Sequence, residues 1–334
     1  MKLITVEFFH LIEKPIGVIN IYFKDNEFMA YDLESRLVIG VASSAVFDLN
    51  ESDEVFKSKG EEEYRKFQES NLNNPLPTGI AYPFIKRLLA LNDLSDDTLV
   101  EVVLLSKNDP DTGLRVMKTI EHYGLNITRA IFMQGKSPYE YIPALNISLF
   151  LSGNKEDVDV AIKSGFPAGR VLDSKFIDDE TDNSLRIAFD FDGVLADDAS
   201  ESVMQASGLD EFHANEVKNV MEPHTPGPLK EFLVRVSKIQ SVEEKYKISH
   251  PEYENRLRIS IVTARNAPSH ERALNTLKKW GVMTNDAFFL GGIEKRKVLS
   301  ILKPHIFFDD QSSHLQLASS VVPSVHIPFG ITNQ

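Results

Sequence analysis

The sequence contains no cysteine among its 334 residues, which excludes disulfides, zinc–thiolate sites and a cysteine nucleophile. It also has no run of about 18 apolar residues, the length that a membrane-spanning helix needs, so we expect no membrane span. Basic residues are few, 36 Lys and Arg against 49 Asp and Glu. The net charge of −13 disfavours polymeric nucleic acid, whose binding rests on neutralised phosphates. Glu7 and His10 interrupt the N-terminal apolar residues too early for a signal peptide, so we expect a cytoplasmic protein.

The residues that are present have the composition of an ordinary globular protein, with 42% hydrophobic and 25% charged residues. At about 100–200 residues per domain, the length suggests two domains. Short apolar runs at 99–105, 187–189, 259–262 and 305–308 suit buried parallel strands, and helical patterns lie between them. This alternation predicts an α/β three-layer fold with a parallel sheet. The polar stretch at 173–184 is the best candidate for a linker.

The two halves of the chain resemble each other at a constant offset of 157 residues. Between positions 115 and 135, six of 21 residues are identical to the residue 157 positions further on. We interpret this as a tandem duplication of units 1–175 and 184–334, although any two strand–helix–strand units share some apolar and glycine positions. In that alignment Ser152 stands where the second half has Asp309, and upstream, after a gap of several residues, Ala42 and Ser44 stand where it has Asp190 and Asp192. The first unit is therefore expected to lack the aspartates of a catalytic site.

The strongest chemical motif is Asp-Phe-Asp-Gly-Val at 190–194, directly after an apolar strand. Ligands of open α/β sheets bind at the carboxyl ends of the strands. There Asp190 can attack phosphorus and hold Mg²⁺, while Asp192 can protonate the leaving oxygen and later accept a proton from water. Gly193 permits a turn that brings the backbone close to phosphate. An Asp-rich turn without catalytic function is the alternative, because the motif alone is only moderately specific.

Later segments supply the other groups that phosphoryl transfer needs, in a consistent order. Thr263 ends a predicted strand and can bind a phosphoryl oxygen, and Lys295 or Lys297 can neutralise the phosphate. Asp309 and Asp310 end a further strand and can complete an oxygen-ligated Mg²⁺ site. Each segment alone has an ordinary structural explanation, such as a strand threonine or a solvated basic run. Together, in this order, they predict a Mg²⁺-dependent phosphohydrolase site.

This set resembles the haloacid dehalogenase-like phosphohydrolases, whose four motifs fall at Asp190/Asp192, Thr263, Lys295 and Asp309/Asp310. Further segments narrow the resemblance to the cytosolic 5′-nucleotidase I family, namely 74–86, Gln-Gly-Lys-Ser-Pro-Tyr at 134–139, Gly-Pro-Leu-Lys-Glu-Phe at 227–232, Ile-Val-Thr-Ala-Arg at 261–265 and 304–311. The similarity runs from about residue 74 to the C-terminus. One departure is Phe191, where relatives more often have glycine, but both flanking carboxylates are kept.

The resemblance implies two Rossmann-like, haloacid dehalogenase-like units, the second with a cap insert at about 200–256. It implies Mg²⁺-dependent hydrolysis of nucleoside 5′-monophosphates, of the AMP or IMP/GMP type, through an aspartyl phosphate. Relatives are cytoplasmic and often homo-oligomeric. Within the resemblance Lys295 fits better than Lys297 as the phosphate lysine. The implied metal ligands are Asp190, Asp192, Asp309 and Asp310.

The resemblance also implies substrate-binding roles for Gly193, Arg265 and Lys230. Lys136 and Ser137 are candidates from the first half, where they occupy a predicted strand end. There they would form a vacant phosphate-like pocket, or reach across to hold the nucleoside or an effector nucleotide. The alternative is that they belong to structural turns.

Two other functions fit parts of the pattern. A related phosphatase acting on a sugar phosphate would use the same motifs. A nucleotide-sensing binding protein would need a broken catalytic element, yet every candidate in the second half is intact, namely Asp190, Asp192, Thr263, Lys295 and Asp309. The sequence therefore favours an enzyme.

Overall fold

The structure is a computed structural model that describes residues 3–6, 19–22 and 31–333. It divides into two compact units, Met1–Asp32 and Leu33–Gln334. In the first unit, β1 (Leu3–Val6) pairs antiparallel with β2 (Ile19–Tyr22). Part of the predicted unit 1–175 thus lies outside the described residues.

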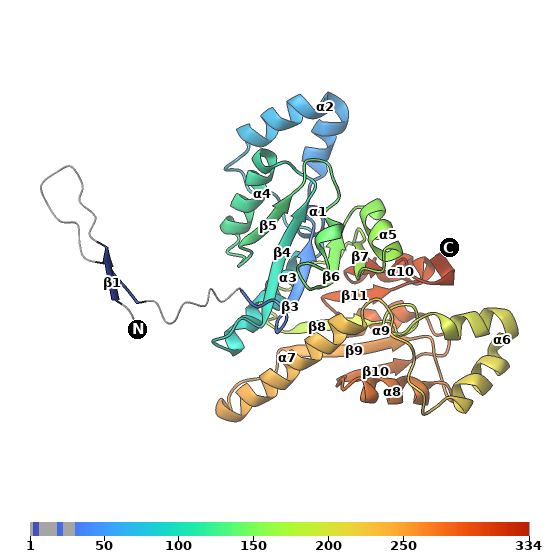
Figure 1. Ribbon diagram of the computed structural model, residues 1–334. Helices are drawn as coiled ribbons and strands as arrows, with labels where there is room; N and C mark the ends of the chain where they lie inside the picture. The colour runs from blue at the N-terminus through green and yellow to red at the C-terminus, as the bar shows by residue number, and fades with distance from the viewer. Residues whose placement is uncertain (1–2, 7–18, 23–30, 334) are drawn as a thin grey trace, which may run out of the picture. The chain divides into compact units, whose positions relative to one another are not determined.

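Ten strands of Leu33–Gln334 form one sheet in the order β10-β9-β8-β11-β12-β7-β6-β3-β4-β5 (Figure 1). Their bounds are β3 (Leu37–Val41), β4 (Val100–Ser106), β5 (Arg129–Phe132), β6 (Ile147–Ser152), β7 (Ala168–Val171), β8 (Leu185–Phe189), β9 (Leu257–Thr263), β10 (Asp286–Phe289), β11 (Ile306–Asp309) and β12 (Ser324–His326). The strands at 99–105, 187–189, 259–262 and 305–308 are therefore present within one or two residues of their predicted bounds. The α/β prediction with a large, mostly parallel sheet is confirmed.

Both halves of the sheet repeat one strand order. From the centre outward, the order is β7-β6-β3-β4-β5 in the first half and β12-β11-β8-β9-β10 in the second. Each half therefore places its fifth, fourth, first, second and third strand in turn. The halves meet where β7 pairs antiparallel with β12, with Val171 opposite Val325 and Arg170 opposite His326. All other neighbours in this sheet are parallel. The strands of the two halves consequently end at opposite edges of the sheet.

Helices pack on this sheet and cross its centre. Their bounds are α1 (Ser43–Val46), α2 (Asn50–Ser70), α3 (Tyr82–Ala90), α4 (Pro110–His122), α5 (Lys155–Lys163), α6 (Ala199–Lys218), α7 (Lys230–Ser249), α8 (His270–Lys279), α9 (Lys295–Leu302) and α10 (Ser312–Ala318), with 3₁₀ turns η1 (Leu91–Leu94), η2 (Tyr139–Tyr141) and η3 (Ile331–Asn333). Helix α3 of the first half contacts β8, and α7 of the second half contacts β3 and β6. None of the described helices is both long and apolar enough to cross a membrane.

Local sequence explains where several elements begin and end. The Asp109 carboxylate accepts from the N–H groups of Asp111 and Thr112, which caps α4 just before Pro110. That helix is followed by Gly124 at φ +63°, a conformation that favours glycine. Residues 172–184 connect β7 to β8 without a helix or strand. Arg87 of α3 holds this connection through an ion pair and two bonds to backbone carbonyls.

Equivalent turns in the two halves share their hydrogen bonds. The Thr119 hydroxyl accepts from Leu76 N (3.1 Å) and donates to Arg115 O (2.8 Å). The Thr276 hydroxyl accepts from His224 N (3.1 Å) and donates to Arg272 O (2.8 Å). Helices α2 and α6 are also alike, since each bends at a glycine with φ +82°.

Candidate active site

A buried lysine joins two buried carboxylates at the strand ends of the second half. Asp190 follows β8, and Asp309 ends the adjacent strand β11. The first residue of α9, Lys295, places its Nζ 2.9 Å from Asp190 Oδ2 and 2.7 Å from Asp309 Oδ2. Lys297 is exposed on the same helix. Of the two candidate lysines, Lys295 is thus the one that the structure brings to Asp190.

The charges in this cluster depend on one another. Burial raises the pKa of Asp190 to about 6, against the opposing effect of Lys295. Burial also disfavours charge on Asp309, but Lys295 and His314 outweigh it and lower the pKa of that carboxyl. The two carboxylates outweigh the effect of burial on Lys295 and raise the pKa of its ammonium group. The lysine is therefore held as a cation inside the protein.

Asp310 has one oxygen without a protein partner. Its Oδ2 accepts from the Thr332 hydroxyl (2.8 Å), whereas the buried Oδ1 has no hydrogen-bond partner among the described residues. Burial and the charges of Asp190 and Asp309 raise the pKa of Asp310 to about 8. Gly193 lies against this carboxyl at φ +70°, where a Cβ atom would come within 2.6 Å of Asp310 Cγ. Only glycine fits there without displacing Asp310.

These carboxyl groups are suited to a divalent cation. One ligand atom from each of Asp190, Asp309 and His314 lies within 4.8 Å of the others. The unpartnered oxygen of Asp310 adds a further candidate donor. Oxygen donors of this kind suit Mg²⁺, and a cation would relieve the repulsion among the three carboxyl groups.

Asp192 is held by a buried arginine. Arg265 donates from Nε to Asp192 Oδ2 (2.7 Å) and from Nη2 to Oδ1 (2.6 Å), a bidentate pairing that fixes the carboxylate plane. The guanidinium lies 5.1 Å from the Phe191 ring centroid and 5.3 Å from that of Phe212. Arg265 was predicted to bind substrate. In the structure its guanidinium is paired with the Asp192 carboxylate.

Glu216 of α6 anchors the far side of that arginine. Its Oε2 accepts from Arg265 Nη1 and lies 3.1 Å from His224 Nε2. Its Oε1 accepts from Arg272 Nη1 (2.8 Å) and from the Ser200 hydroxyl (2.9 Å). Burial opposes its charge, but His224 and Arg265 outweigh burial and lower the pKa of Glu216.

Most of the predicted site residues meet at this edge of the sheet. Asp190, Asp192, Gly193, Thr263, Arg265, Lys295, Asp309 and Asp310 lie at or just beyond the carboxyl ends of β8, β9 and β11, or at the start of α9. Thr263 is buried, and its hydroxyl accepts from Arg265 N (3.2 Å). Lys230 begins α7 in the same half, with its Nζ 3.8 Å from Glu231 Oε2.

Two predicted residues lie elsewhere. Lys136 is exposed, and the Ser137 hydroxyl donates to Asp157 Oδ1 (2.9 Å) in the first half, at the opposite edge of the sheet. Within one chain these side chains do not join Asp190. Sequence reasoning in turn missed Glu216 and His314. The signal for His314 was its place in the first turn of the helix that follows Asp309 and Asp310.

Comparison with known proteins agrees with this geometry. A family model described as 5'-nucleotidase matches residues 29–334. The human protein "Cytosolic 5'-nucleotidase 1B" is 33% identical over 290 residues, which are 85% of this chain and 47% of that protein. The chain thus spans about half the length of this relative. No solved structure matches the chain.

Proposed function

Because the chain belongs to the 5′-nucleotidase family, we propose that it hydrolyses nucleoside 5′-monophosphates to nucleoside and phosphate, with Mg²⁺ as cofactor. The resemblance read from the sequence is confirmed by the family match and by the 33% identity to the human relative. One observation carries the proposal. A buried Lys295 contacts both Asp190 and Asp309, while a second buried cation, Arg265, orients Asp192 beside them.

The side chains divide the reaction between them. Asp190 attacks phosphorus, and the bond from phosphorus to the ribose 5′-oxygen breaks as an aspartyl phosphate forms. Asp192 donates a proton to the departing oxygen, then accepts one from the water that releases phosphate. Thr263 and Lys295 stabilise the phosphoryl oxygens by hydrogen bonding and charge. Mg²⁺ held by Asp190, the Asp192 carbonyl, Asp309 and Asp310 would neutralise phosphoryl charge.

The duplication gives this proposal its architecture. We infer that 1–175 and 184–334 are copies of one haloacid dehalogenase-like unit. The repeated strand order, the paired bonds of Thr119 and Thr276 and the matching bends of α2 and α6 support this. Within the insert at 200–256, α6 covers Arg265 with Phe212 and Glu216, which suits a cap. Helix α7 packs against β9, β3 and β6.

Location, assembly and substrate selection extend the same proposal. A cytoplasmic location follows the family resemblance and the printed name of the human relative. A homo-oligomer also follows the family resemblance. The Gly193 turn and Lys230 are proposed to contact the substrate, because the turn follows β8 and the residue before Lys230, Leu229, donates its N–H to Val194 O (2.9 Å).

Phosphate release from AMP, IMP, GMP, CMP, UMP and their deoxy forms, with and without Mg²⁺, tests the function. We expect release from at least one of them, and a loss of at least about a thousandfold in Asp190→Asn, which keeps the shape but removes the nucleophile. Asp210→Asn, an exposed carboxylate on α6, is the matched control and should leave release unchanged. Faster release from glucose 6-phosphate would favour a sugar phosphatase. No release from any substrate by folded protein would favour a binding protein.

A further inference from the structure

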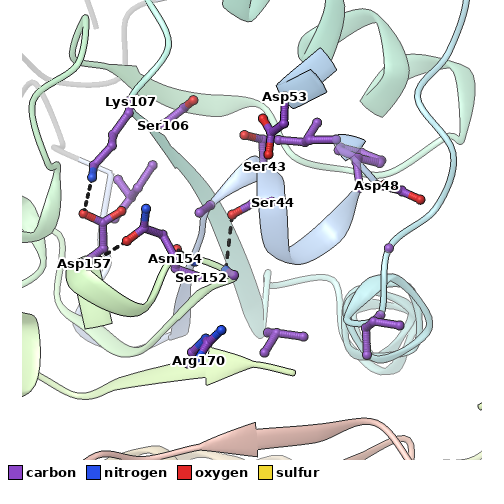
Figure 2. Close-up of a pocket in the computed structure, with 18 of the residues that line it drawn as sticks. Ser43, Ser44, Asp48, Asp53, Ser106, Lys107, Ser152, Asn154, Asp157 and Arg170 are labelled. Atoms are coloured by element: carbon purple, nitrogen blue, oxygen red, sulfur yellow. Dashed lines mark hydrogen bonds and ion pairs between the residues drawn. The ribbon is translucent and has the colours of Figure 1, made fainter. Parts of the chain in front are cut away.

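A second cavity lies at the strand ends of the first half. Its volume is about 630 Å³, and the carboxyl ends of β3, β4 and β6 line it together with Arg170 of β7 (Figure 2). This is the edge of the sheet opposite to Asp190, because β7 and β12 run antiparallel. By strand order it is the counterpart of the candidate active site. The volume lies within the range of pockets that bind small molecules.

Serine hydroxyl groups line this cavity where the second half has two aspartates and a threonine. Ser44, Ser106 and Ser152 stand in the positions of Asp192, Thr263 and Asp309. Each hydroxyl oxygen accepts a backbone N–H, at 3.2 Å for Ser44, 3.1 Å for Ser106 and 3.0 Å for Ser152. In this arrangement each O–H can donate to a ligand.

The inner part of the cavity carries positive charge. Lys107 Nζ is 2.6 Å from Asp157 Oδ1, so these two charges balance (Figure 2). Arg170 adds a guanidinium whose Nε is buried and has no hydrogen-bond partner in the described part of the chain. A buried donor without a partner is costly unless a ligand supplies the acceptor. An anionic group, phosphate above all, satisfies both the guanidinium and the serine hydroxyls.

The outer part of the cavity is acidic. Asp48 and Asp53 line it with exposed side chains, on the side away from Lys107 and Asp157 (Figure 2), and the exposed Asp173 also lines the cavity. Carboxylates accept hydrogen bonds from hydroxyl and amino groups, such as those of a ribose or a base. The two ends of the cavity therefore differ in the chemistry that they can recognise.

We propose that this cavity binds a nucleoside monophosphate, with its phosphate toward Arg170 and its sugar toward the acidic residues, and does not hydrolyse it. Ala42 takes the place of the nucleophile Asp190, and Pro138 takes that of Lys295. The positions of Asp190, Asp192 and Asp309 carry no carboxylate there, so the cavity lacks counterparts of the proposed nucleophile and of these proposed metal ligands. It is a binding site separate from the reaction, and it does not depend on the proposed function.

The test is isothermal titration calorimetry of the whole 334-residue chain carrying Asp190→Asn, titrated with AMP in the presence of Mg²⁺, which measures the number of sites and their affinities. We expect two AMP per chain, one in each half. Adding Ser44→Glu, which puts an anion beside the phosphate, should weaken one of the two sites at least tenfold, whereas the equally large Ser44→Gln should weaken it much less. Ser44 is exposed, so both variants should fold alike, which melting temperatures check. Arg170→Gln should weaken the same site, and Lys163→Gln, an exposed cation of α5, should not.

The outcomes separate the two proposals. One AMP per chain, abolished by Ser44→Glu, would support the cavity and count against nucleotide binding in the catalytic half. Binding that neither Ser44→Glu nor Arg170→Gln changes would overturn the cavity proposal, and so would the absence of any binding. Inorganic phosphate is the second probe. If it binds this site as tightly as AMP, the assignment of the acidic end to the sugar is wrong.

Discussion

Glu216 is the residue on which the buried positive charge of the second half depends. It accepts from both Arg265 and Arg272, and it is 1% exposed. The first half has Gln68 in the matching place, and its Oε1 accepts from Arg115 Nη1 at 3.2 Å. The position of Arg265 is taken there by Asn108. A neutral amide therefore suffices in the first half, whereas the second half needs a carboxylate.

Glu216→Gln should lower the free energy of unfolding by about 1.5–3 kcal/mol, because it removes the carboxylate charge that the buried Arg265 and the half-buried Arg272 share. Asp192 remains paired with Arg265. Urea unfolding measures this loss. Glu211→Gln, an exposed glutamate of the same helix, should stay within about 0.5 kcal/mol of the parent. Equal stability of the two variants would mean that the carboxylate charge of Glu216 is not required.

His305 should make the protein sensitive to acid. Burial, with Arg87 and Arg186 nearby, lowers its pKa to about 3, and its Nδ1 accepts from Arg186 N (3.0 Å). The unfolded chain takes up this proton below its ordinary pKa of 6.5, whereas the folded chain does not until about 3. His305 thus has no effect on the free energy of unfolding above about pH 6.5. As the pH falls from about 6.5 to about 3, it lowers the free energy of unfolding by about 1.4 kcal/mol per pH unit.

Unfolding measured across this pH range checks the effect. His305→Asn keeps an acceptor near the position of Nδ1 but cannot be protonated. Its stability should fall less steeply with acid than that of the parent. Parallel curves for the two proteins would show that His305 does not titrate on unfolding.

Single residues of the site differed in how far sequence could predict them. Asp190, Thr263 and Asp309 could be predicted from the sequence, because each lies at the end of a buried strand and parallel strands end at one edge of the sheet. The pairing of Arg265 with Glu216 could not be predicted. The two residues are 49 positions apart, and Glu216 is one of several acidic residues in its segment. Only the folded backbone shows which of them turns inward.

At the scale of elements, the bends in α2 and α6 depend on glycine. Gly60 and Gly208 have φ +82° with ψ near 180°, a region that glycine alone adopts readily. No atom lies within 4 Å of a Cβ added at either position, so a methyl group would meet only backbone strain. The bend in α6 directs the following turns, with Phe212 and Glu216, onto Arg265.

Gly60→Ala and Gly208→Ala should each cost about 1–3 kcal/mol of stability. Only Gly208→Ala should also lower kcat/KM for nucleotide hydrolysis, because α2 lies in the first half, away from the reaction. Denaturation and steady-state kinetics on both variants make the comparison. A similar kinetic loss in Gly60→Ala would contradict the separate roles of the two helices.

Elements were predicted best where local chemistry sets their limits. At α4, for example, the sequence itself carries an N-capping aspartate (Asp109), Pro110 and Gly124 at the two ends of the helix, and capping and chain reversal are local effects. The segment at 200–256 was harder, since the family resemblance implied a cap insert there without indicating which of its residues are buried. Helix α7 within it buries Phe232, Leu233 and Val236 against the sheet. The helix packs against strands of both halves, β9 of the second and β3 and β6 of the first, and the local sequence pattern does not reveal these neighbours.

At the scale of the molecule, the two halves share one sheet and exchange helix contacts. Beyond the β7–β12 pair, Arg235 of α7 donates to Arg36 O (2.6 Å) and to Asn146 Oδ1 (3.1 Å) in the first half. Contacts of this kind couple the unfolding of one half to that of the other. The junction itself was not predictable, because β7 (Ala-Gly-Arg-Val) and β12 (Ser-Val-His) are short and only partly apolar.

We expect both halves to unfold in one urea transition. Trp280, the single tryptophan, reports on the second half through its fluorescence. The double variant Trp280→Tyr with Tyr123→Trp moves this probe to the corresponding place in the first half. The two midpoints should coincide with each other and with far-UV circular dichroism. Separate midpoints would show that the halves unfold independently.

The antiparallel meeting of β7 and β12 also bears on how the protein could be inhibited. It turns the cavity of the first half and the candidate active site toward opposite edges of the sheet. A molecule that occupies only the first-half cavity leaves the path of the substrate open. A molecule bound there could therefore lower the maximal rate without blocking substrate from the active site. Because we propose that the cavity binds nucleoside monophosphate, accumulating substrate would displace such a molecule from the cavity itself.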